Sequence, residues 1–104
     1  MRISKHAQKR LKQRGGFNKK SYVRIAQRAF KDGIVLARTK GRLRKWMSRL
    51  YGYNKKADNI RLYGGMAYIF YDGVLVTVIQ IPAHLMKDFK KMIKLRNDSG
   101  KEKI

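Results

Sequence analysis

The sequence predicts an α+β domain with three N-terminal helices, a three-stranded antiparallel β-meander and a C-terminal helix. Three observations lead to this prediction. Residues 59–81 (NIRLYGGMAYIFYDGVLVTVIQI) are rich in β-branched and aromatic side chains and poor in charge. The dipeptides Gly64-Gly65 and Asp72-Gly73 divide this segment where two-residue hairpin turns fit. On both sides of the segment, apolar residues instead recur with helical spacing.

The first two helices have recognisable ends. Ser4 is an N-cap residue type for a helix that runs to about Arg14, where Gly15-Gly16 ends it. Asn18 then caps a second helix from about Lys19 to Lys31. The apolar residues of this helix follow the i, i+3, i+4 spacing of an amphipathic helix: Tyr22, Ile25, Ala26, Ala29 and Phe30.

The third helix opens at Thr39 and has an apolar side formed by Leu43, Trp46, Met47, Leu50 and Tyr51. Before it, Ile34–Ala37 fits a strand, a helix extension or a buried linker. After the sheet, Pro82 stops the last strand, and Ala83–Leu95 has the spacing of a closing helix. Residues 1–96 therefore form one predicted domain, and residues 97–104 form a frayed polar tail.

The three predicted strands are Ile60–Tyr63, Met66–Tyr71 and Val74–Ile81. With two-residue turns, alternation places an aliphatic set on one face: Ile60, Leu62, Ala67, Ile69, Tyr71, Val74, Val76 and Val78. The other face mixes aromatic and polar groups: Arg61, Tyr63, Met66, Tyr68, Phe70, Leu75, Thr77 and Ile79. We expect helices to cover the aliphatic face and to bury Phe30 and Trp46 there. The aromatic face either accepts a ligand or lies under the closing helix.

The charge of the chain is strongly unbalanced. It has 27 Lys and Arg against 6 Asp and Glu, a net charge of +21. Residues 1–56 hold 19 of the basic residues and a single acid, so most of the excess belongs to the predicted helical half. Such an excess favours an anionic partner: nucleic acid first, then an anionic membrane surface, then an acidic protein.

Candidate nucleic-acid contacts follow from this distribution. Lys and Arg side chains that neutralise phosphates release counterions and so drive binding. Aromatic side chains on an open sheet face stack on unpaired bases. The candidates are Arg10, Arg14, Lys20, Arg24, Arg28, Arg42, Lys45, Arg49, Arg61, Tyr63 and Tyr68.

The residue types give little support to disulfides, metal or cofactor sites, or insertion in a membrane. The absence of cysteine excludes disulfides and thiolate metal sites, and it fits a cytoplasmic location. The two histidines, His6 and His84, lie far apart in sequence, so we predict no metal and no cofactor. There is no apolar run of about 18 residues and no signal-peptide pattern, which argues against insertion in a membrane.

Two stretches resemble known groups of proteins. The opening SKHAQKRLKQRGGFNKKSYVRIAQRA contains His6, Ala7, Arg10 and Arg14. It resembles the HAxxRxxxR opening of a broad family of small bacterial domains that are distantly similar to RelE-like and BrnT-like ribonuclease toxins. The later stretches KGRLRKW and LYGYNKKADNIRLYGGMAYIF resemble small basic proteins of bacterial prophages and mobile elements.

The first resemblance implies metal-independent cleavage of RNA. In that case His6 would transfer the proton, and Arg10 and Arg14 would stabilise the charge of the transition state. It also implies an acidic, antitoxin-like protein partner. From the residues alone, the same three side chains fit a solvated basic edge of a helix, because they recur every fourth residue.

Three functions therefore remain open at the level of the sequence. The first is a nucleic-acid-binding protein of a phage or mobile element, with RNA favoured over DNA, that contacts phosphates through its helical half. The second is a metal-independent endoribonuclease. The third is a host-directed inhibitor of a nucleoprotein complex, of the anti-CRISPR or anti-defence type, which requires only the same basic surface.

Overall fold

The computed structural model describes residues 1–15 and 18–102 and confirms the α+β class. The elements follow one another in the order β1 (Arg2–Ile3), α1 (Lys5–Gly15), α2 (Lys19–Asp32), the 3-10 turn η1 (Leu36–Arg38), α3 (Gly41–Tyr53), β2 (Asn59–Tyr63), β3 (Met66–Tyr71), β4 (Val74–Gln80) and α4 (Ala83–Glu102). Gly16 and residues 103–104, which belong to the predicted end of the first helix and to the predicted tail, lie outside the described residues.

The sheet differs in detail from the predicted three-stranded antiparallel meander. It has four strands in the order β1-β4-β3-β2, and β1 pairs in parallel with β4. The pairs β2–β3 and β3–β4 are antiparallel. The sequence prediction omitted β1 because a strand of two residues has no periodicity, and because its pairing partner, β4, lies far away in the sequence.

The two turns of the meander have the predicted chemistry. Gly64 and Gly65 have φ of 58° and 83°, and Asp72 and Gly73 have φ of 49° and 76°. Both central residues of each turn thus have positive φ, which is the geometry that matches the right-handed twist of a hairpin.

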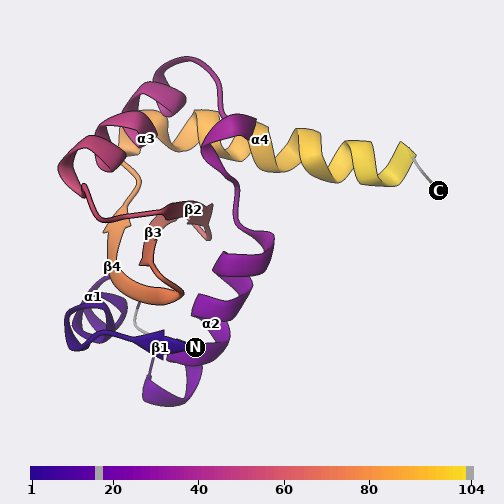
Figure 1. Ribbon diagram of the computed structural model, residues 1–104. Coiled ribbons are helices and arrows are strands. Elements are labelled where there is room, and N and C mark those ends of the chain that lie inside the picture. The colour runs from indigo at the N-terminus through magenta and orange to yellow at the C-terminus, as the bar shows by residue number, and fades with distance from the viewer. Residues whose placement is uncertain (16–17, 103–104) are drawn as a thin grey trace.

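Helices cover both faces of the sheet, which gives three layers (Figure 1). On the aromatic face, α1 and α2 bury Met66, Tyr68 and Phe70. On the aliphatic face, α3 and α4 cover the other core cluster, formed by Ile34, Leu43, Met47, Leu50, Ile60, Leu62, Ala67, Ile69, Ile81, Leu85 and Phe89. The expectation that the closing helix covers the aromatic face is therefore wrong.

A β-bulge changes the predicted register of β4. Phe70 lies opposite Leu75 and Ile69 lies opposite Thr77, so Val76 is an extra residue on its strand. Every side chain beyond the bulge consequently points to the opposite face. Val78, predicted for the aliphatic face, packs beneath α1 and α2 instead, whereas Ile79 packs on the side of α3 and α4.

Hydrogen bonds from Ser4 stabilise the bulge and the start of α1 together. The Oγ of Ser4 accepts a bond from the Ala7 amide at 3.0 Å and donates to the Val76 carbonyl at 2.9 Å. The N-cap prediction for Ser4 is confirmed, and so is that for Asn18, whose side chain accepts from the Ser21 amide. At α3 the N-cap is Lys40 rather than Thr39, which is buried.

Some predicted core positions lie at the margin of the core. Phe30 is 37% exposed and meets Phe70 edge-to-face, with ring centroids 5.1 Å apart. Trp46 and Val76 are half-buried against α3, α4 and the sheet. Helix α4 continues past the predicted end at Leu95 to Glu102, and its last part projects beyond the three layers (Figure 1).

Candidate functional site

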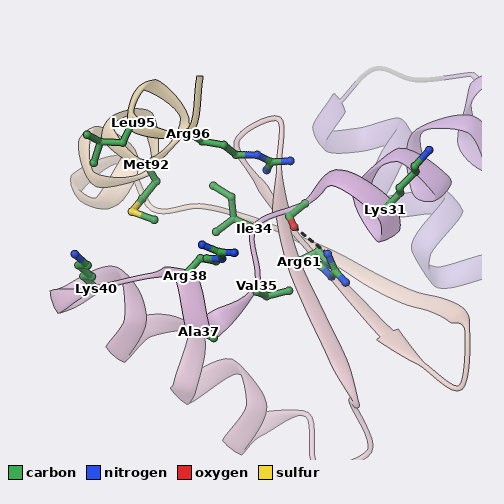
Figure 2. A pocket seen from close by; sticks show the side chains of 11 residues that line it. Lys31, Ile34, Val35, Ala37, Arg38, Lys40, Arg61, Met92, Leu95 and Arg96 are labelled. Carbon is green, nitrogen blue, oxygen red and sulfur yellow. Dashed lines mark hydrogen bonds between the residues drawn. The ribbon is translucent and has the colours of Figure 1, made fainter. Parts of the chain in front are cut away.

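A pocket with a volume of about 700 Å³ opens where the end of α2, η1, β2 and α4 come together (Figure 2). We call it the basic pocket. Its lining residues are Lys31, Gly33, Ile34, Val35, Ala37, Arg38, Lys40, Arg61, Met92, Leu95 and Arg96. None of these eleven residues is acidic, and five of them are Lys or Arg.

The cations of the basic pocket come from distant parts of the sequence. Lys31 belongs to α2, Arg38 to η1, Arg61 to β2 and Arg96 to α4. Figure 2 shows the guanidinium groups of Arg38 and Arg96 directed toward the segment 33–35. Like charges gathered in one concave site repel one another, so an anion that enters the site relieves this repulsion.

Arg61 is held in place by acceptors that carry no charge. Its Nε donates to Asn59 Oδ1 and its Nη1 donates to the Gly33 carbonyl, each at 3.1 Å. Because a guanidinium has five N–H donors, three remain after these two bonds, and its positive charge is not neutralised by them. Arg61 is thus oriented before any anion binds.

Arg96 makes a similar contact with the backbone. Its Nη1 donates to the Asp32 carbonyl at 2.6 Å, across the gap between α4 and the end of α2. Together, Arg61 and Arg96 place two positive charges at the C-terminus of α2, where they also interact favourably with the helix dipole. These arginines therefore connect α2, β2 and α4 as well as line the basic pocket.

The peptide segment beside Arg61 requires a glycine at position 33. A Cβ built on Gly33 would lie 2.6 Å from the Cβ of Arg61 and would also collide with the carbonyl oxygen of Ala29. Ile34, the next residue, forms an isolated antiparallel bridge with Leu62. The close approach allowed by Gly33 therefore brings α2 against the edge of β2 and positions the wall of the basic pocket.

A second concentration of charge lies along α2 and ends at the basic pocket. Lys20, Arg24, Arg28 and Lys31 are exposed and are spaced by four, four and three residues, so they form one stripe. We call it the α2 stripe. Four helical residues rise about 6 Å, which separates successive cations along a line. Lys31 belongs to both the stripe and the pocket.

The candidate contacts on α3 are separated from those on α2 by the sheet. Lys45 and Arg49 are exposed on α3, and a second, more open concavity of about 610 Å³ lies beside them. Because α2 and α3 cover opposite faces of the sheet, the predicted helical half does not form one continuous contact surface (Figure 1).

Arg42, also on α3, is engaged by a carboxylate. Its Nε lies 2.7 Å from Asp88 Oδ2 of α4, and this is the one ion pair among the described residues. The hydrogen bond from Arg42 lowers the pKa of Asp88 from its ordinary value, and the same bond raises the pKa of Arg42. A phosphate would compete with Asp88 for Arg42, which makes Arg42 a weaker phosphate contact than its sequence position suggested.

The candidate catalytic residues lie on α1. His6 and Arg14 are exposed, Arg10 is half-buried, and all three recur along one edge of the helix. His6 lines neither the basic pocket nor the concavity on α3. The structure therefore places the proposed proton-transfer residue on an open helix surface.

Tyr63 and Tyr68, which were predicted to stack on unpaired bases, do not lie on an open sheet face. Tyr68 is 0% exposed beneath α1 and α2, so the expectation that a base stacks on it needs correction. Tyr63 is half-buried and meets Tyr68 edge-to-face, with ring centroids 6.4 Å apart. The sheet has no open aromatic face because two helices lie on it.

Sequence reasoning did not select Lys31, Arg38, Lys40 or Arg96 as site residues. The spacing of α2 places Lys31 in line with Arg24 and Arg28, which is a local signal. No local signal distinguishes Arg38, Lys40 or Arg96 from the other basic residues, because only tertiary contacts bring them around one cavity. Arg61 was selected, although for the open sheet face rather than for this pocket.

Within residues 1–15 and 18–102, no three His, Asp or Glu side chains gather as a metal site, and no helix is long and apolar enough to cross a membrane. Comparison of the chain with protein-family models, curated proteins and solved structures finds no match. The basic pocket and the α2 stripe are therefore the features that bear on function.

Proposed function

We propose that this protein binds a nucleic-acid strand, with RNA favoured over DNA, through phosphate contacts along the α2 stripe. The observation that carries the proposal is the continuity between the α2 stripe and the basic pocket. Lys20, Arg24 and Arg28 lead along an exposed helix surface to Lys31, beyond which Arg38, Arg61 and Arg96 extend the positive surface.

The arrangement suits a sequence-independent contact. Lys and Arg contacts to phosphate carry no base information, and their contribution to the binding free energy comes from counterion release. The α2 stripe offers cations at regular steps, and the described part of α2 has a single acid, Asp32, at its last position. On α3, by contrast, Asp88 already occupies Arg42.

Charge reversal on the two helices tests the proposal. Arg24→Glu with Arg28→Glu alters the α2 stripe, and Lys45→Glu with Arg49→Glu is the matched change on α3. All four residues are exposed, so both variants are expected to fold. Fluorescence anisotropy with single-stranded RNA and DNA of equal length, measured over a range of NaCl concentrations, gives the affinity and its salt slope.

We expect the α2 variant to bind RNA at least about tenfold more weakly and with a smaller salt slope, whatever the sequence of the RNA. The α3 variant should bind within a few-fold of the parent. If the α3 variant loses more affinity, α3 forms the interface and the α2 proposal fails. If the parent protein binds anionic vesicles but neither nucleic acid, the proposed class of partner is wrong.

A further inference from the structure

The basic pocket combines a cationic side with an apolar side. Arg38, Arg61 and Arg96 supply charge, while Met92 and Leu95 of α4 supply apolar surface. Leu95 is 63% exposed, so part of the apolar lining is in contact with water, and Figure 2 shows Met92 directed toward the side on which Arg38 lies. A ligand that is anionic at one end and flat or apolar at the other would use both sides.

The size of the basic pocket also favours a nucleotide over a bare phosphate. A volume of about 700 Å³ lies within the range of cavities that bind small organic molecules. A bare phosphate would use the arginines but would leave Met92 and Leu95 without a contact. A nucleotide has both a phosphate for the arginines and a base that can lie against apolar side chains or guanidinium planes.

We infer that the basic pocket binds a nucleoside monophosphate unit, with its phosphate near Arg38 and Arg96 and its base against the apolar lining at Met92. The unit is either the phosphorylated end of a strand or a free nucleotide. The strand-end form rests on the proposed function, because a strand along the α2 stripe reaches the pocket at Lys31.

The charge of a terminal phosphate favours it over an internal one. A phosphate monoester carries about −1.5 to −2 charges at pH 7, whereas an internal phosphodiester carries one. Five cations around one cavity gain more from the doubly charged group. Arg96 is already oriented by its hydrogen bond to the Asp32 carbonyl, so less of its side-chain freedom remains to be lost on binding.

Two variants with the same loss of charge test the inference. Arg38→Gln with Arg96→Gln changes the basic pocket, and Arg24→Gln with Arg28→Gln changes the α2 stripe. Arg38→Gln alone serves as a second pocket variant, because Arg96 also contacts the Asp32 carbonyl and its replacement affects α4. The probes are one RNA 12-mer with a 5′-monophosphate, a 3′-monophosphate or hydroxyl ends, together with AMP and inorganic phosphate.

For the strand-end form, we expect the parent protein to prefer one phosphorylated end at least about tenfold, the scale of one charge-assisted hydrogen bond. Both pocket variants should lose this preference. The stripe variant should bind all the RNAs more weakly but retain the ratio. Loss of affinity in the stripe variant thus tests the proposed function, whereas the ratio tests the pocket.

For the free-nucleotide form, AMP raises the melting temperature of the parent protein more than inorganic phosphate does at equal ionic strength, and the pocket variants lose this effect. This form requires no end preference among the RNAs. Equal effects of AMP and inorganic phosphate would overturn the free-nucleotide form. The absence of both an end preference and a specific effect of AMP would overturn the inference as a whole.

Discussion

The hydroxyl of Tyr68 is buried without a hydrogen-bond partner among the described residues. An unsatisfied buried polar group costs about 1–3 kcal/mol, whereas the tyrosine ring contributes its packing beneath α1 and α2 with or without the hydroxyl. We therefore expect Tyr68→Phe to raise the free energy of unfolding by about 1 kcal/mol. Urea unfolding at pH 7 measures this change, and a destabilised variant would indicate that the hydroxyl has a partner.

Because of Tyr68, we also expect the free energy of unfolding to depend on pH in the alkaline range. Burial, followed by the nearby Tyr63, raises the pKa of Tyr68 from about 10 to about 12. Between these values the unfolded chain loses the proton while the folded protein retains it, so stability falls as pH rises from about 10 to 12. The Tyr68→Phe variant should not show this fall in stability, because phenylalanine has no hydroxyl proton to lose. The stability difference between variant and parent should grow across that window and stay constant between pH 7 and 9.

His6 tests whether the resemblance to ribonuclease toxins has catalytic content. His6 is exposed on α1, lines neither concavity and is not part of the α2 stripe. We expect His6→Gln to bind RNA within a few-fold of the parent. If the parent cleaves RNA in the presence of chelator, removal of a general acid or base should slow cleavage by about 100-fold or more. Intact RNA at stoichiometric protein would end the enzyme hypothesis.

At the scale of elements, the junction between α2 and β2 depends on Gly33, which has no side chain. Gly33→Ala places a methyl group against Arg61 and the carbonyl oxygen of Ala29, and overpacking of this kind costs about 1–3 kcal/mol. Gly52→Ala is the matched control, since a Cβ there meets nothing within 4 Å and alanine favours a helix. Thermal unfolding should show a loss for the first variant and no loss for the second.

The bulge in β4 leads to a second prediction at the scale of elements. Val78 is 0% exposed, whereas Val76 is half-buried, although both occupy one strand. Val78→Ala should therefore lower the free energy of unfolding by about 2 kcal/mol, and Val76→Ala should lower it by clearly less. Equal losses would contradict the bulged register, because the two variants remove the same atoms from positions of different burial.

At the scale of the whole molecule, the net charge of +21 opposes folding, since the compact state brings like charges together. Raising NaCl from 0.1 M to about 1 M shortens the screening length from about 10 Å to about 3 Å. We expect the melting temperature to rise over this range and to rise less for Arg24→Gln with Arg28→Gln. A melting temperature that falls with added salt would show that favourable ion pairs outweigh repulsion.

Local chemistry made much of the molecule predictable from its sequence. The apolar spacing of α2 predicted Tyr22, Ala26 and Ala29 as its buried side, and the two positive-φ turns predicted the hairpins. The caps at Ser4 and Asn18 belong to the same class of evidence. These features depend on residues a few positions apart, so consecutive residue types are sufficient to determine them. The charge excess, which directed attention to an anionic partner, is likewise a property of composition.

The remaining features of the fold and of the candidate site depend on long-range contacts. The pairing of β1 with β4, the extra residue Val76 and the burial of Tyr68 under α1 and α2 each depend on segments that are distant in sequence. The basic pocket has the same origin, because Arg38, Arg61 and Arg96 come from three elements and share no spacing. The sequence by itself therefore determined the local elements and the sign of the surface charge. Only the tertiary structure decided which face each helix covers and which cations meet, because both depend on the packing of the layers rather than on neighbouring residues.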